Sequence, residues 1–208
     1  MNSLEHDLIR AVGSLRFLIA VIIQTVILTQ AGADSTLYQM SVPFCCTLPY
    51  TCAWLDESRS GFIRLALHRT SVFWYITGKF LACILSGGLC ELAAAFIASL
   101  LDKELDLTGC CPQIFLTAAL WAGLAALLAA CSGSKYSAYG GAFVICYFLI
   151  ILHERYWKCC YVLDPLEWLS PKEQWVFGMT GLHILLICVL LVTGLCYAAV
   201  LERRLTNV

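Results

Sequence analysis

Long apolar blocks dominate this sequence and restrict what it can fold into. The stretch from Met179 to Leu201 contains no aspartate, glutamate, lysine or arginine, and about 20 such residues in a helix can cross the hydrocarbon core of a bilayer. Hydrophobic residues make up 61% of the chain and charged ones 13%, whereas a soluble domain carries roughly 45–50% apolar and about 25% charged residues. We therefore expect an all-α polytopic membrane protein with little mass outside the bilayer. A net charge of −1 argues against a nucleic-acid partner.

Six blocks predict six transmembrane helices in a single membrane domain covering residues 1–208. They are Phe17–Ala31, Leu37–Leu55, Ile76–Leu101, Ile114–Cys131, Ala138–Leu152 and Met179–Leu201. The second block contains Pro43 and Pro49, and a proline inside a helix removes a backbone hydrogen bond, so this span should be kinked. Residues 1–16 are more polar and are expected to form an amphipathic helix before the first span.

Lysine and arginine are unevenly divided between the two sides that six spans would create. If both termini lie on one side, that side holds nine of the 13 basic residues: Arg10, Arg16, Arg59, Arg64, Arg69, Lys79, Lys135, Arg203 and Arg204. The other side holds Lys103, Arg155, Lys158 and Lys172. Because cytoplasmic loops carry an excess of these residues, the pattern predicts a multi-pass protein of the cell membrane with both termini in the cytoplasm.

The segment DESRSGFIRLALHRT, from Asp56 to Thr70, breaks the apolar pattern with charge. It would be the largest cytoplasmic loop, and a serine near its start can cap a short helix. Phe62, Ile63 and Leu67 would form the apolar face of that helix. Two interpretations remain open: an interfacial helix whose arginines bind anionic headgroups, or a docking element for a cytoplasmic partner.

The order of residues around this segment resembles a known family. The pattern is acidic-x-x-Ser-Gly-Phe, a short helix, Arg-Thr-Ser, then Tyr-x-x-Gly-Lys and a span rich in small residues. In this chain the matching residues are Glu57, Ser60, Gly61, Phe62, Leu67, Arg69, Thr70, Ser71, Tyr75, Gly78, Lys79 and the run Ser86, Gly87 and Gly88. The pattern is similar to that of membrane permeases of the ATP-binding-cassette type-two exporter family, especially small Gram-positive versions, and the likeness extends to the six-span layout.

The resemblance implies roles for three segments. Residues 56–71 would contain a cytoplasmic coupling helix, Gly61–Arg69, between spans two and three, which sits in a groove of an ATPase subunit. Residues 1–16 would be a connecting helix at the inner surface, and residues 153–178 would form short extracellular helices before span six. The residues expected to bind the ATPase are Glu57, Gly61, Phe62, Ile63, Arg64, Leu67 and Arg69.

The resemblance also implies partners, because the chain has no ATPase motif of its own. A phosphate-binding loop needs a glycine five residues before its Gly-Lys pair, and Gly78-Lys79 has Phe73 at that position. ATP and Mg would therefore be bound by a separate ATPase chain. A second permease, identical or related, would complete the pathway. The family resemblance suggests a peptide antibiotic or a lipid as substrate.

Few other residues suggest chemistry. Glu91 is the only carboxylate well inside a predicted span, and such a residue is either part of a transport pathway or neutralised locally. His153-Glu154 does not continue into a zinc-protease motif, because position 157 is tryptophan. Cys110-Cys111 and Cys159-Cys160 are expected outside the membrane, either as disulfides or as free thiols. We predict no catalytic or metal site in the chain, but a membrane-embedded enzyme and a non-transporting scaffold or immunity protein remain alternatives.

Overall fold

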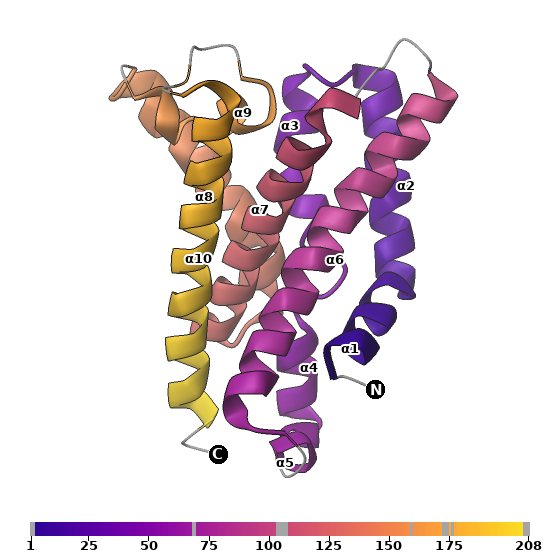
Figure 1. The fold of residues 1–208 in the computed structure, drawn as a ribbon, viewed down its shortest axis with the longest axis vertical. Coiled ribbons are helices and arrows are strands. Elements are labelled where there is room, and N and C mark those ends of the chain that lie inside the picture. The colour runs from indigo at the N-terminus through magenta and orange to yellow at the C-terminus, as the bar shows by residue number, and fades with distance from the viewer. Residues whose placement is uncertain are drawn as a thin grey trace.

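The computed structural model describes residues 3–67, 70–102, 108–158, 160–171, 175 and 177–205, and every element in these ranges is helical (Figure 1). The α-helices are α1 (Ser3–Val12), α2 (Leu15–Ala31), α3 (Thr36–Cys45), α4 (Ala53–Arg59), α5 (Phe62–Leu67), α6 (Val72–Leu101), α7 (Cys111–Ser132), α8 (Lys135–Arg155), α9 (Pro165–Leu169) and α10 (Gly178–Leu205). Two short 3-10 helices are η1 (Thr108–Cys110) and η2 (Tyr161–Leu163).

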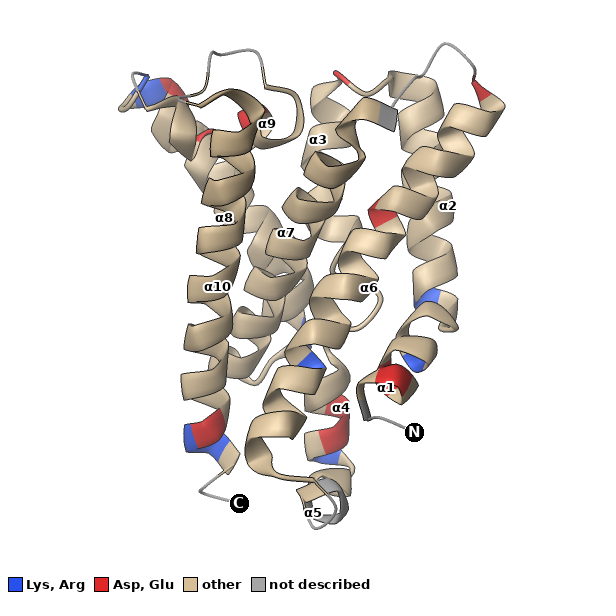
Figure 2. Ribbon diagram, in the orientation of Figure 1, with Lys and Arg blue, Asp and Glu red and all other residues tan. Residues whose placement is uncertain are grey.

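Four helices in the described part of the chain are long and apolar enough to cross a membrane: α6, α7, α8 and α10. The pair α1 and α2, bent by 53° at its break, passes the same test when taken as one span. Charged residues gather near the two ends of the bundle, which leaves the middle of the long helices almost without charge (Figure 2). The fold is therefore all-helical, with four to five candidate spans, and is compatible with a membrane protein.

The predicted second span is not a single kinked helix. It consists of α3 and α4, which lie towards opposite ends of the bundle and are separated by turns over residues 46–52 (Figure 1). Pro43 lies in the last turn of α3 and cannot donate a backbone hydrogen bond, and Pro49 falls in the break. The break is enclosed by protein, with Thr47 fully buried and its hydroxyl donating to the carbonyl of Phe44 at 2.7 Å. Irregular backbone at membrane depth is tolerated where protein buries it in this way.

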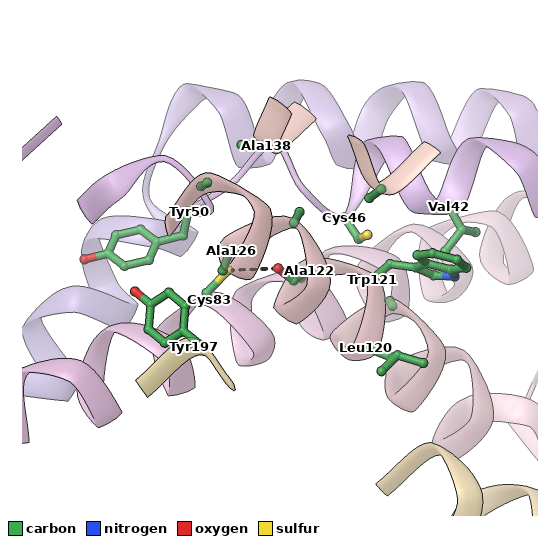
Figure 3. Packing of buried hydrophobic residues seen from close by; sticks show 14 of the residues in the cluster. Val42, Cys46, Tyr50, Cys83, Leu120, Trp121, Ala122, Ala126, Ala138 and Tyr197 are labelled. Atoms are coloured by element: carbon green, nitrogen blue, oxygen red, sulfur yellow. Dashed lines mark hydrogen bonds between the residues drawn. The ribbon is translucent and has the colours of Figure 1, made fainter. Parts of the chain in front are cut away.

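Small residues let α6 and α7 pack closely at the centre of the bundle. α7 buries residues on most of its circumference, many of them alanines, and Trp121 is 1% exposed. Figure 3 shows the contact between the two helices, where the Cys83 thiol lies 3.5 Å from the carbonyl oxygen of Ala122. Helices without large side chains at their contact can approach closely enough for extensive van der Waals packing.

The outer helices expose apolar side chains instead of polar ones. On α10 the exposed large residues include Ile184, Leu191 and Leu195, and on α8 they include Val144 and Phe148. A soluble monomer rarely leaves such a continuous apolar surface uncovered. The same surface is suited to contact with lipid chains.

The segment before α10 is folded against the bundle, with η2 and α9 as short helices. The carbonyl oxygen of Trp168 accepts hydrogen bonds from Gln113 Nε2 at 2.9 Å and Thr117 Oγ1 at 3.2 Å, both on α7. The Trp168 ring lies 5.7 Å from the Trp121 ring. These contacts attach α9 to the end of α7. Short helices, η2 and α9, are thus present in residues 153–178, the segment for which short helices were predicted.

A substitution at Gly87 tests whether α6 approaches α7 closely. A Cβ atom at this position would lie 2.6 Å from the Cβ of Ala122 and 2.9 Å from the backbone oxygen of Cys46. Neither atom can move without shifting a helix, so we expect Gly87→Ala to lower the free energy of unfolding by about 1–3 kcal/mol. Gly140→Ala is the control, because a Cβ there meets nothing within 4 Å. Unfolding in detergent micelles measures both, and equal stability of the two variants would contradict the packing described.

Candidate functional site at a buried ion cluster

Lys79 of α6 lies inside the protein with its charge paired on two sides. Its Nζ atom is 2.8 Å from Asp7 Oδ1 on α1 and 2.6 Å from Glu57 Oε1 on α4. Nζ also donates to the hydroxyl of Tyr50 at 3.0 Å, from the break between α3 and α4. A lysine ammonium has three N–H donors, so these contacts satisfy all of them at a side chain that is 6% exposed.

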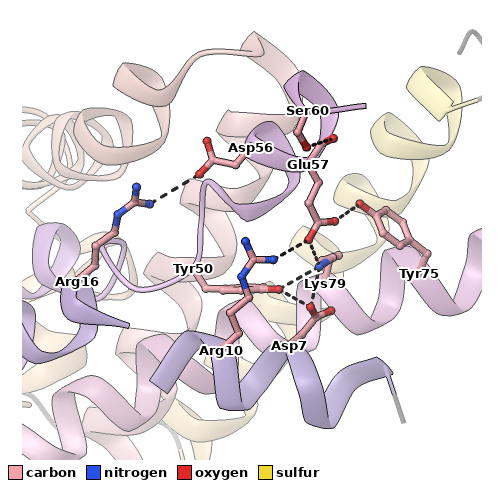
Figure 4. Close-up of polar contacts among 9 residues, drawn as sticks. All are labelled: Asp7, Arg10, Arg16, Tyr50, Asp56, Glu57, Ser60, Tyr75 and Lys79. Atoms are coloured by element: carbon pink, nitrogen blue, oxygen red, sulfur yellow. Dashed lines mark hydrogen bonds and ion pairs between the residues drawn. The ribbon is translucent and has the colours of Figure 1, made fainter. Parts of the chain in front are cut away.

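Further polar contacts hold the two carboxylates in place (Figure 4). Tyr50 donates its hydroxyl hydrogen to Asp7 Oδ1 at 2.7 Å, and Tyr75 donates to Glu57 Oε2 at 2.8 Å. Arg10 Nη1 lies 3.5 Å from Glu57 Oε1 at the edge of the group. We call these six residues the Lys79 cluster: Asp7, Arg10, Tyr50, Glu57, Tyr75 and Lys79.

The Lys79 cluster is electrically balanced, because two basic and two acidic side chains meet in it. Burying one unpaired charge costs several kcal/mol (on the order of 3–5 kcal/mol when a partner is removed), whereas a paired and hydrogen-bonded set avoids this cost. The ammonium of Lys79 also lies 5.4 Å from the Tyr50 ring centre and 5.6 Å from that of Tyr75, within range of cation–π attraction. The cluster therefore joins α1, α4 and α6 through directional contacts that depend on one another.

Helical spacing explains how the sequence brings these groups together. Tyr75 and Lys79 are four residues apart on α6, so both side chains lie on one face, and Ser71 caps the start of this helix by accepting from the backbone N–H of Trp74. On α1, Asp7 and Ala11 are also four apart and form the buried face, while Ile9 is 62% exposed. The amphipathic helix thus presents a carboxylate, and not only apolar groups, to α6.

The residues predicted to bind an ATPase fall into two groups. Glu57 is 4% exposed and Ile63 is 3% exposed, so both side chains contact the interior of this chain, and their contact with an ATPase stays a prediction. Phe62 is 51% exposed, Leu67 is partly buried against the core, and Gly61 has a φ of 72° at the turn into α5. Two of the predicted residues lie outside the described side chains: Arg64 and Arg69.

Sequence reasoning missed two members of the cluster, Asp7 and Tyr50. Asp7 is the one acidic residue on the buried face of α1. A helical projection shows this once Ala11 is known to be buried. Tyr50 lies in the break after α3, where no periodic pattern indicates which way a side chain points. Lys79 was noted for the family resemblance but not as the centre of a buried site.

Glu91 is fully buried in α6, further along the helix than the Lys79 cluster. Its carboxylate interacts with the side chain of Gln24 on α2, without a hydrogen bond of close geometry. Gln24 is also fully buried, and its Oε1 accepts a hydrogen bond from Ser41 Oγ at 3.0 Å. Polar groups from α2, α3 and α6 thus lie in the interior of the bundle. The role of Glu91 in a transport pathway stays a prediction.

Other candidate residues lie at the opposite end of the bundle. His153 Nδ1 is 3.4 Å from Asp164 Oδ2, and burial is the main cause that raises the pKa of Asp164 above its usual value. Cys110 and Cys160 carry free thiols, while Cys159 lies outside the described residues. Within the described ranges, no three histidine, cysteine, aspartate or glutamate side chains converge in a group able to hold a metal ion.

Comparison with known proteins adds no family assignment. No protein-family model, curated protein or solved structure matches the chain.

Removing the charge of Lys79 tests the electrostatic account of the cluster. We expect Lys79→Met to lower the free energy of unfolding by about 3–5 kcal/mol, because Asp7 would remain buried without a counter-charge and Glu57 would keep only the exposed Arg10. The matched control is the triple variant Asp7→Asn, Glu57→Gln and Lys79→Met, which removes the three charges together and should recover most of the loss. Denaturant unfolding in micelles gives both values. A triple variant as unstable as the single one would show that charge balance is not what holds these helices.

Proposed function

We propose that this chain is the membrane-spanning subunit of an ATP-driven exporter, forms half of the translocation pathway and is coupled to a separate ATPase subunit. The observation that carries the proposal is the position of α5 between α4 and α6, the two helices that Glu57 and Lys79 join. Glu57, Tyr75 and Lys79, which belong to the sequence pattern shared with exporter permeases, contact one another in this cluster. The pattern residues Gly61, Phe62 and Leu67 lie between them in sequence, at α5.

The arrangement suits force transmission from a cytoplasmic partner. α5 is a short helix at the end of the bundle, between the end of α4 and the start of α6 (Figure 1). Glu57 and Lys79 tie α4 to α6, so a push on α5 would move both helices together. Phe62, which is half exposed, is the side chain best placed to fill an apolar pocket of the ATPase, and central apolar anchors contribute most to such interfaces.

The proposed topology has six crossings, with α2 as the first, preceded by α1 at the inner surface, and the interrupted α3–α4 segment as the second. α1, α5 and the end of α10 lie towards the same end of the bundle (Figure 1), and that end is proposed to face the cytoplasm. η2 and α9 would then be extracellular. A second permease would complete the pathway, Glu91 would belong to the pathway within this chain, and the substrate would be a peptide antibiotic or a lipid.

Affinity purification from native membranes tests the proposal. The tagged chain should bring down an ATP-hydrolysing subunit, and Phe62→Ala should reduce the recovered ATPase by about tenfold or more, as expected for loss of an interface anchor of about 2 kcal/mol. Gly61→Pro should act similarly, because proline fixes φ at about −65° and Gly61 has a φ of 72°. Phe177→Ala is the matched control, since Phe177 is 85% exposed outside α5 and α6.

The outcomes separate the candidate functions. If Phe62→Ala and Phe177→Ala bring down the same amount of ATPase, α5 is only a membrane-surface element. No ATPase with the unmodified chain would contradict the exporter proposal and favour a membrane-embedded enzyme or a non-transporting scaffold or immunity protein.

Cysteine labelling tests the proposed orientation. On a cysteine-free background, Ser60→Cys should react with a membrane-impermeant maleimide only after the cells are permeabilised, because residue 60 precedes α5 on the proposed cytoplasmic side. Cys160, restored alone, is exposed in the segment before α9 and should react in intact cells. Labelling of position 60 from outside would reverse the topology.

A further inference from the structure

A cavity of about 350 Å³ opens beside the junction of α1 and α2, and the function proposed above does not use it. Its lining includes Arg10 from α1, Ser14 and Arg16 from the junction, and Asp56 from α4. Both arginine side chains are more than half exposed, at 59% and 53%. The cavity is therefore open to the surface, with charged side chains beside apolar ones in its lining.

The acidic groups near the cavity are already paired with cations. Glu57 contacts Lys79 inside the Lys79 cluster, and Lys135 Nζ contacts Asp56 Oδ1. Arg16 lies 3.9 Å from Asp56 Oδ2 and donates to the Tyr139 hydroxyl at 3.3 Å. In the described part of the chain, the contacts of both arginines involve only Nη1. A guanidinium carries five N–H donors, so each retains donors for an anion.

An apolar stripe begins where the cavity ends. Leu15 lines the cavity and is 72% exposed. Leu18 and Ile22, three and seven residues further along α2, are 55% and 57% exposed and lie on the same helix face. The two guanidinium groups thus lie at one end of an exposed aliphatic face of α2, and α2 belongs to a candidate span.

We propose that this cavity binds the phosphate headgroup of an anionic phospholipid, whose acyl chain lies along Leu15, Leu18 and Ile22. Arginine pairs a phosphate oxygen with two parallel N–H donors, and basic recesses between membrane helices bind anionic headgroups. The amphiphilic ligand matches both halves of the surface, whereas a soluble anion would leave the stripe unused. The inference does not depend on exporter activity.

Lipid binding can be measured by native mass spectrometry of the purified full chain after delipidation. Phosphatidylglycerol should bind in preference to phosphatidylcholine. The double variant Arg10→Gln and Arg16→Gln should weaken phosphatidylglycerol binding by about tenfold or more, since each basic residue near an anionic surface contributes about 1 kcal/mol and 1.4 kcal/mol is tenfold in affinity. Arg10→Lys with Arg16→Lys should retain most of the binding, and thermal unfolding checks that each variant is folded.

Two controls distinguish a specific lipid site from general attraction. Arg59→Gln with Arg203→Gln removes two other exposed arginines of the proposed cytoplasmic side and should change the affinity by less than about twofold; an equal loss would overturn the site. Leu15→Asn with Leu18→Asn should weaken phosphatidylglycerol binding. Inorganic phosphate that competes as well as the lipid, or no effect of the leucine changes, would overturn the lipid as ligand.

Discussion

The buried charge of Lys79 is the constraint around which this end of the molecule is organised. An ammonium group on a largely apolar helix needs counter-charge and hydrogen-bond acceptors within about 3 Å of Nζ, whereas α6 itself supplies only the Tyr75 ring, whose centre is 5.6 Å away. Asp7 and Glu57 therefore come from two other helices, and Tyr50 from an interrupted segment. The positions of α1, the break after α3 and α4 are linked through this one side chain.

The interruption of the second apolar block follows from the same requirement. On a continuous helix Tyr50 and Glu57, seven residues apart, would be separated by about 10.5 Å along the axis, whereas the turns over residues 46–52 let both contact Lys79 Nζ. The polar backbone of this break is enclosed by neighbouring helices, with Thr47 fully buried. The first half of the chain therefore buries several polar groups, whereas α7, α8 and α10 bury mainly apolar side chains.

The sequence predicted the long apolar helices well, because the length of an apolar block is enough to indicate such a helix. The blocks Ile114–Cys131 and Met179–Leu201 correspond to α7 (Cys111–Ser132) and α10 (Gly178–Leu205), with small shifts at their ends. The break after α3 could not be foreseen, since proline predicts a loss of helix but not where the chain goes next. Asp7 and Glu57 are separated from Lys79 by 72 and 22 positions, and residue order does not encode such long-range pairing. Glu57 and Ile63 are buried within this chain, which the sequence did not indicate because an amphipathic pattern does not show which face another helix covers.

Hydrogen exchange measures the central claim, that the Lys79 cluster holds α1, α4 and the start of α6 as one unit. Amide protection should be compared segment by segment between the unmodified chain and Lys79→Met in the same lipid nanodiscs. The account predicts a joint loss of protection in α1, α4 and the first turns of α6, with α7, α8 and α10 unchanged, because breaking the shared contacts frees all three elements at once. Faster exchange in α6 alone, with α1 and α4 as protected as before, would contradict it.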